Sequence, residues 1–95
     1  MRNYEVAFIA HPELDEASLN ALVEKAKGWV SAAGGQVMQV DLWGRRRLAY
    51  PIRKQREGQY VLMQTQMTAV ATHDVERNLR LTEQVMRFQI IRTDD

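Results

Sequence analysis

The amino-acid sequence predicts an α+β fold, in which a four-stranded antiparallel sheet carries two helices on one face. Four segments have strand patterns and two have helical periodicity, in the order strand, helix, strand, strand, helix, strand. The chain has 95 residues, 45% of them hydrophobic, which is enough for a single domain over residues 1–95 with one core. Right-handed crossovers around both helices then give a split βαβ arrangement, the ferredoxin-like βαββαβ sandwich.

The first strand is predicted over residues 4–10, because both of its faces are largely apolar, as in an interior strand. Pro12 follows it and cannot donate to a sheet ladder. Asp15 is the predicted N-cap of the first helix, and glycines 34 and 35 are its predicted end. The apolar stripe of this helix recurs at three- and four-residue spacing: Leu19, Leu22, Val23, Ala26, Val30 and Ala33.

A long second strand is predicted from Gln36 to about residue 50. Its apolar alternation slips around Trp43 and the following glycine, which predicts a bulge or bend there. Residues 51–57 are predicted to form a basic, flexible hairpin tip. Gly58 is then expected to turn the chain into a third strand over residues 60–67.

A short second helix is predicted over about residues 70–81. Thr68 is its expected cap, with Thr72 as the alternative. The last strand is predicted over residues 84–92, and residues 93–95 are expected to form a frayed acidic end.

The sheet face away from the helices is predicted to be too apolar for contact with water alone, and a contiguous apolar patch indicates an interaction site. A register error that scatters its apolar residues is the alternative. On the two central strands this face offers one aromatic ring, Tyr60, so no aromatic platform for stacking bases across the sheet is predicted. The predicted residues of the face are Glu5, Ala7, Ile9, Tyr60, Leu62, Gln64, Arg87, Gln89 and Ile91.

Six of the 13 Lys and Arg residues fall between Arg45 and Arg56. Guanidinium groups packed this closely repel one another unless an anion lies among them, and phosphate is the anion that arginine binds in a bidentate way. A solvated basic loop explains the run equally well. Because the formal net charge is only +1, any contact with nucleic acid has to come from such a local cluster.

No catalytic or metal-binding constellation is found in the sequence, so neither an enzyme nor a cofactor is predicted. Neither His11 nor His73 has a partner at metal-ligand spacing, and the chain has no cysteine. No serine or threonine stands near a candidate base. The first residues lack the apolar core of a signal peptide, and no apolar run approaches the ~20 residues of a membrane span. A cytoplasmic protein without membrane association is therefore expected.

The ten residues from Gly44 to Arg53, GRRRLAYPIR, together with the opening Arg2-Asn3-Tyr4-Glu5, resemble the bacterial small-ribosomal-subunit protein number six family. The resemblance extends over essentially the whole chain. Two residues depart from the family's pattern, since Trp43 and Arg45 stand where smaller aliphatic residues are expected beside the glycine. The residues that match the signature by position are Gly44, Arg46, Arg47, Leu48, Tyr50, Pro51 and Ile52.

The resemblance implies a structural component of the ribosome. Members of this family pair with the small-subunit ribosomal protein number eighteen, and the pair binds the central domain of the small-subunit rRNA. It leaves open which signature residues contact RNA and which contact the protein partner, and Tyr50 and Pro51 have a structural alternative. For phosphate we expect Arg2, Arg45, Arg46, Arg47, Lys54, Arg56, Arg87 and Arg92. For the protein partner we expect Ile9, Tyr60, Leu62 and Ile91.

The competing hypothesis is a ferredoxin-like regulatory module that forms a homodimer through the open face and binds a small anion. It predicts a stable dimer in isolation, whereas the ribosomal hypothesis predicts a monomer that binds bare RNA weakly. A third idea, an acyl-phosphate hydrolase on the same fold, needs an arginine in the first loop. That loop reads His11-Pro12-Glu13-Leu14, which counts against it.

Overall fold

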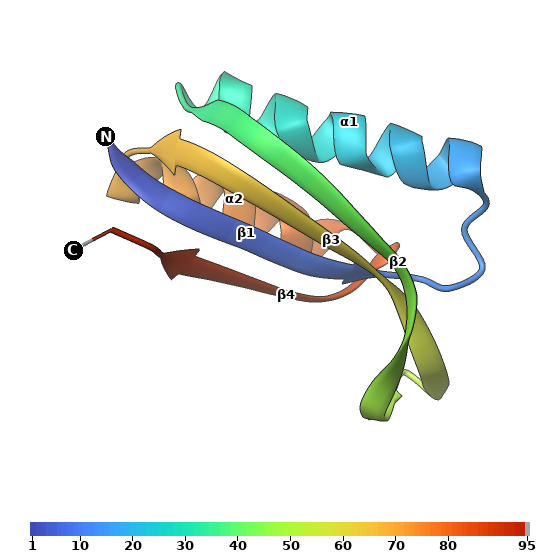
Figure 1. Ribbon diagram of the computed structural model, residues 1–95. Coiled ribbons are helices and arrows are strands. Elements are labelled where there is room, and N and C mark those ends of the chain that lie inside the picture. Colours follow the sequence, from blue (N-terminus) through green and yellow to red (C-terminus); the bar gives the residue numbers. More distant parts are fainter. Residues whose placement is uncertain (95) are drawn as a thin grey trace.

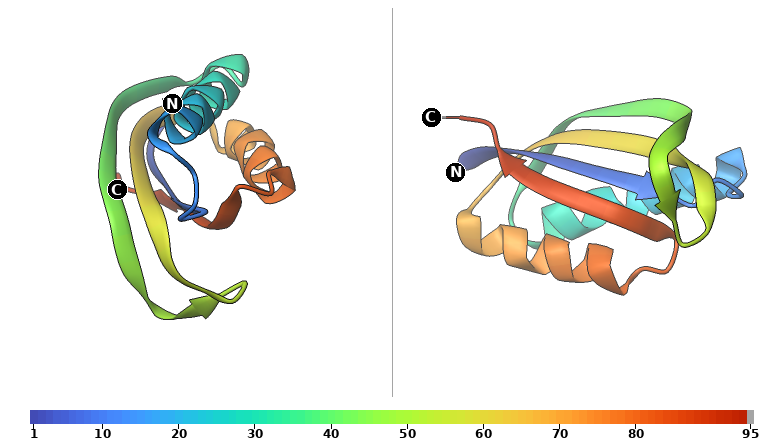
Figure 2. Two further views of the ribbon diagram at one scale, coloured as in Figure 1. Left: turned by 90° about the vertical axis from the view of Figure 1, so that its right-hand side faces the viewer. Right: turned by 90° about the horizontal axis from the view of Figure 1, so that it is seen from below.

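The computed structural model describes residues 1–94, and its elements follow the predicted order. The strands form one antiparallel sheet in the order β2-β3-β1-β4, and both helices cover the same face of it (Figures 1 and 2). The predicted ferredoxin-like βαββαβ sandwich is thereby confirmed. The bounds are β1 Arg2–Ala10, α1 Glu16–Ala32, β2 Gln36–Ile52, β3 Gln55–Met67, α2 Ala69–Leu81 and β4 Val85–Arg92.

The hydrophobic core lies between the two helices and the inner face of the sheet. The central strands β1 and β3 supply its middle, where Phe8 is 2% exposed and Met63 is fully buried. The predicted alternation along both strands is confirmed, because every second residue of each is buried there. Neither helix in the described part of the chain has the length and apolar character needed to span a bilayer. The helices contribute Leu19, Leu22, Val23, Ala26, Val30, Ala71, Val75 and Leu79.

Helix α1 begins and ends where the sequence predicts. The carboxylate of Asp15 accepts a hydrogen bond from the backbone N–H of Ser18 at 2.8 Å, which closes the N-terminal cap. This hydrogen bond lowers the pKa of Asp15, because it favours the ionised carboxylate. Beyond the helix end, Gly34 has a φ of +87°, the left-handed conformation that glycine adopts without steric cost.

The cap makes stability depend on pH in a predictable direction. Since the folded-state pKa of Asp15 lies below its unfolded value, its contribution is present above about pH 4 and is lost as the pH falls through the folded pKa. Asparagine also caps helices but does not titrate. The free energy of unfolding of Asp15→Asn should therefore decline less steeply than that of the wild type between about pH 5 and pH 3. Urea denaturation at four pH values measures this difference.

Glu13→Gln is the matched control, because it removes a neighbouring negative charge without changing the cap. Its stability should follow the wild-type pH dependence more closely than Asp15→Asn does. Parallel curves for Asp15→Asn and the wild type would show that the cap carries no pH-dependent stability.

The hairpin between β2 and β3 is longer and tighter than predicted. Strand β2 continues to Ile52 and β3 starts at Gln55, so the turn consists of Arg53 and Lys54 alone. The prediction of a flexible tip over residues 51–57 is therefore wrong. Both turn residues have positive φ angles, 50° and 65°, as a two-residue turn matching the twist of the strands requires. Glycine or asparagine is the usual signal for such a turn, and neither is present.

Two further contacts explain this tight turn. The guanidinium of Arg53 donates hydrogen bonds to the carbonyls of Glu83 and Val85, at 2.8 and 3.2 Å, and so ties the turn to the start of β4. The prediction that Gly58 turns the chain is wrong, because Gly58 lies inside β3, opposite Arg46. Because Arg53 is bonded to the start of β4, the end of the hairpin curls past β1 toward β4 (Figure 2).

The last described residues are tied to β1. The N–H of Thr93 donates to the carbonyl of Asn3 at 2.9 Å, and the N–H of Asn3 donates to the carboxylate of Asp94 at 3.0 Å. The hydrogen bond from the backbone N–H of Asn3 and a second one from the guanidinium of Arg92 lower the pKa of Asp94. The prediction of a frayed end is wrong for these residues, while Asp95 lies outside the described part of the chain.

Candidate nucleic-acid interface

The three consecutive arginines do not form one cluster. They lie in β2, opposite three consecutive residues of β3, and successive side chains of a strand point to opposite faces. Arg46 lies on the open face of the sheet, away from the helices, and Arg45 and Arg47 lie on the other. Mutual repulsion is relieved by this alternation, so the arginine run does not require an anion at its centre.

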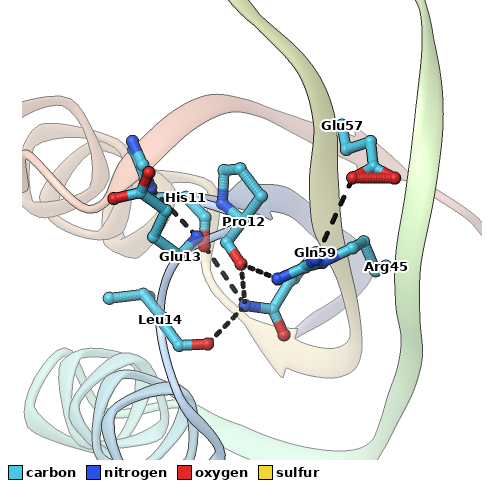
Figure 3. Close-up of polar contacts among 7 residues, drawn as sticks. All are labelled: His11, Pro12, Glu13, Leu14, Arg45, Glu57 and Gln59. Atoms are coloured by element: carbon cyan, nitrogen blue, oxygen red, sulfur yellow. Dashed lines mark hydrogen bonds and ion pairs between the residues drawn. The ribbon is translucent and has the colours of Figure 1, made fainter.

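Arg45 makes a contact within the protein. Its guanidinium donates to the carbonyl of Pro12 at 2.5 Å (Figure 3). The side-chain amide of Gln59, which is paired with Arg45 across the hairpin, donates to the carbonyls of His11 and Leu14 at 3.2 and 2.9 Å. These bonds hold the β1–α1 loop against the two strands. The predicted phosphate ligand Arg45 thus also has a structural role.

The remaining basic residues of the hairpin are open to solvent. Arg47, Lys54 and Arg56 are all exposed. Arg47 and Arg56 line a shallow hollow of about 440 Å³ together with Pro12. Glu57 also lines this hollow, so its lining has both signs of charge, on an element that projects beyond the end of β1 (Figure 1).

Trp43 lies beside Tyr60 on the open face, a neighbour that the sequence analysis missed. The pairing register of β2 shifts between Leu42 and Gly44, where a bulge was predicted, and Gly44 has a φ of +78°. This bulge turns Trp43 to the open face. Its ring is nearly parallel to that of Tyr60, with 6.4 Å between centroids, and the Arg46 guanidinium lies 6.0 Å from the tryptophan ring centroid.

Other residues of the GRRRLAYPI signature shape the hairpin. Leu48 is buried, with 9% of its surface exposed. The hydroxyl of Tyr50 accepts a hydrogen bond from Arg87, whose guanidinium lies 5.8 Å from the tyrosine ring centroid. Pro51 is near the end of an edge strand, where its missing N–H is tolerated. Ile52 closes the ladder opposite the first residue of β3. These contacts bring the hairpin against β4.

The predicted phosphate ligands do not form one surface. Arg2 and Arg92 lie at the opposite end of the sheet from the hairpin, and Arg92 forms an ion pair with Asp94 at 3.0 Å. The eight residue steps from Arg2 to Ala10 correspond to about 26 Å along an extended strand. A single nucleic-acid segment therefore has to be long to reach both ends of the sheet.

The predicted protein-binding residues are contiguous with one exception. Ile9 is paired with Tyr60, and Leu62 follows two residues later on the same face of β3. A hollow of about 240 Å³ adjoins Ile9 and Tyr60. Ile91 instead lies opposite Glu5, four residues along β1 from Ile9, and is 43% exposed. The apolar patch is therefore smaller than the sequence predicts, with Ile91 outside it.

The chemistry that this arrangement supports is binding of an anionic ligand. The part of β2 and β3 over residues 44–58, which we call the outer hairpin, carries exposed guanidinium and ammonium groups. An aromatic pair lies at its base, and an apolar patch lies beyond that pair. Among residues 1–94, no group of three or more His, Asp or Glu side chains is placed to hold a metal ion.

Comparisons with known proteins agree with this picture. The family model described as ribosomal protein S6 matches residues 3–92. Small ribosomal subunit protein bS6 of Carboxydothermus hydrogenoformans is 43% identical over 94 residues, covering 99% of this chain and 98% of the relative. Its counterpart in Clostridium novyi is 47% identical over 91 residues, covering 96% of each. The crystal structure of 30S ribosomal protein S6 from Thermotoga maritima superimposes with a TM-score of 0.92 at 30% identity, covering 97% of this chain and 87% of that one. The protein belongs to the ribosomal protein S6 family, a family of ribosomal proteins and not of enzymes.

Proposed function

We propose that the protein is a structural component of the small ribosomal subunit, in the cytoplasm. In this role it binds the central domain of the small-subunit rRNA together with the ribosomal protein number eighteen. The observation that carries the RNA contact is the outer hairpin, a projecting element on which Arg47, Lys54 and Arg56 are exposed. Guanidinium and ammonium groups bind phosphate regardless of sequence, so they position the protein on the RNA.

The hairpin is the primary RNA contact in this proposal. Arg46 and Arg87 add positive charge on the open face, where Arg46 lies near Trp43 and Arg87 near Tyr50. Arg45 acts mainly through its bond to the β1–α1 loop. Arg2 and Arg92 are at the far end of the sheet and contact phosphate only where the RNA extends along the protein.

The protein partner is proposed to bind the open face, at Ile9, Tyr60 and Leu62, with Ile91 at the periphery. The formal net charge of +1 supports a shared RNA site, because only the local basic cluster is left to contact phosphate, and a few phosphate contacts release few counterions. A basic partner would supply the remaining positive charge. In isolation the protein is proposed to be a monomer with this face exposed.

The test is RNA binding by filter retention, with the central-domain rRNA fragment at several salt concentrations, with and without the partner protein. The proposal expects tight binding only when the partner is present. An Arg46→Ala/Arg47→Ala variant should bind more weakly, with a log-log salt slope about one to two units shallower than that of the wild type, because two phosphate contacts are lost.

Arg77→Ala/Arg80→Ala is the matched control, because it removes the same charge from α2, where these arginines pair with Asp74 and Glu76. Its salt slope should stay near the wild-type value. Equal effects of both variants would show that net charge alone matters and would reject the hairpin as the RNA contact. Tight binding of bare RNA without the partner at physiological salt would contradict the joint-binding proposal.

A further inference from the structure

An exposed aromatic pair lies at the base of the outer hairpin, and the hydrophobic core does not account for it. Trp43 on β2 is 52% exposed, although a tryptophan buries a large apolar surface when it contributes to a core. Its nearly parallel neighbour Tyr60 lies on β3. Arg46 completes the group, with its guanidinium near the tryptophan ring. Three planar groups therefore gather on one exposed part of the sheet.

We propose that Trp43, with Tyr60 and Arg46, forms a stacking site for an unpaired nucleobase of RNA. This inference rests on the proposed function and deepens it, because it assigns a base contact to a surface so far given only phosphate contacts. Aromatic rings and guanidinium planes are the protein groups on which splayed-out bases stack. Stacking is tolerant of sequence, since every base has a π-face.

The charges around the pair suit a nucleotide. On one side, the Arg46 guanidinium lies near the Trp43 ring. On the other side, Ile9 is paired with Tyr60 in β3 and with Arg87 in β4, so Arg87 lies on the same face as the rings. A base on the rings thus has positive charge on both sides for the phosphates that flank it. This complementarity favours a nucleotide over an uncharged ligand.

The position of the pair also favours RNA over the protein partner. Trp43 belongs to the edge strand β2, next to the arginines of the outer hairpin. The apolar residues Ile9 and Leu62 lie on β1 and β3. Trp43 therefore lies at the border of their patch, on the side where the arginines of the outer hairpin begin. Tyr60 is the boundary between the two surfaces.

The test uses the fluorescence of Trp43 in a Trp29→Phe background, in which it is the only indole. The probes are a single-stranded adenosine hexaribonucleotide and a hexamer of equal charge with abasic riboses. The adenosine hexamer should quench Trp43 and the abasic hexamer should not. In the wild-type background, Trp43→Leu should weaken binding of the adenosine hexamer by about 5- to 150-fold. Trp43→Phe should retain part of the affinity.

The salt dependence separates stacking from charge. Trp43→Leu removes no phosphate contact, so its log-log salt slope should equal that of the wild type, whereas Arg46→Ala should flatten it. Equal binding of both hexamers by the wild type would overturn the proposal. An equal loss of affinity for both hexamers in Trp43→Leu would also overturn it. So would a Trp43→Leu variant that no longer binds the partner protein but binds the adenosine hexamer with wild-type affinity.

The stacking site and the proposed function fail separately. Quenching of Trp43 by the adenosine hexamer, without partner-dependent binding of the central-domain fragment, would keep the stacking site and reject the proposed function. Partner-dependent binding of the fragment, without quenching of Trp43 by the adenosine hexamer, would keep the proposed function and reject the stacking site.

Discussion

Replacing Phe8 with alanine is expected to lower the free energy of unfolding by about 3–5 kcal/mol. Phe8 is 2% exposed and lies in the middle of β1, a central strand whose inner face packs against the helices. The substitution removes buried apolar surface and leaves a cavity that the surrounding side chains fill only in part. Because domains of this size are stable by about 5–15 kcal/mol, the loss is a large share of the total. Urea denaturation at pH 7 measures it.

Phe88→Ala is the matched control. Phe88 is paired with Phe8 across the β1–β4 ladder, but it lies on the edge strand, is partly exposed and has the Arg80 guanidinium 5.8 Å from its ring centroid. Phe88→Ala should lower the free energy of unfolding by about half as much as Phe8→Ala, because less apolar surface returns to water and no closed cavity forms. Equal losses for the two variants would contradict the placement of the core between the inner face and the helices.

The fold was predictable because its signals are local and agree with one another. The stripe of α1 has one periodicity, Asp15 caps its start and Gly34 follows its end, so three independent patterns gave the same element. The alternation of β1 and β3 likewise assigned their faces without knowledge of the pairing. Right-handed crossovers then left few topologies for six such elements.

The hairpin was less predictable because it depends on contacts between distant residues. The turn at Arg53 and Lys54 contains no glycine, and Arg53 bonds to carbonyls about 30 residues away in sequence. The orientation of Trp43 follows from the bulge at Gly44, whose presence was predicted but whose effect on the faces was not. A bulge exchanges the faces of the residues on one side of it, so its position has to be known to a single residue.

Gly58 shows the same dependence on distant contacts, and its substitution is expected to be costly. A Cβ at this position would lie 2.2 Å from Cγ2 of Ile9 and 3.5 Å from the carbonyl oxygen of Ala10. Ile9 is branched at Cβ and has few alternative rotamers, so the backbone has to shift. Gly58→Ala should lower the free energy of unfolding by about 1–3 kcal/mol. Gly28→Ala is the control, because Gly28 lies within α1 with nothing within 4 Å of the added Cβ, and it should raise stability by about 0.5–1 kcal/mol.

A double-mutant cycle identifies the cause of the loss at Gly58. Ile9→Ala removes the methyl group that the new Cβ would meet, so the double variant Gly58→Ala/Ile9→Ala should be more stable than the sum of the single effects predicts, by about 1 kcal/mol or more. If the changes in the free energy of unfolding are additive, the close approach of Gly58 to Ile9 does not explain the need for glycine at this position. Because Gly58 is paired with Arg46 across the hairpin, a backbone shift there also moves the proposed stacking site. Recovery of stability and of adenosine-hexamer binding together in the double variant would therefore link the packing beneath the outer hairpin to its contact with RNA.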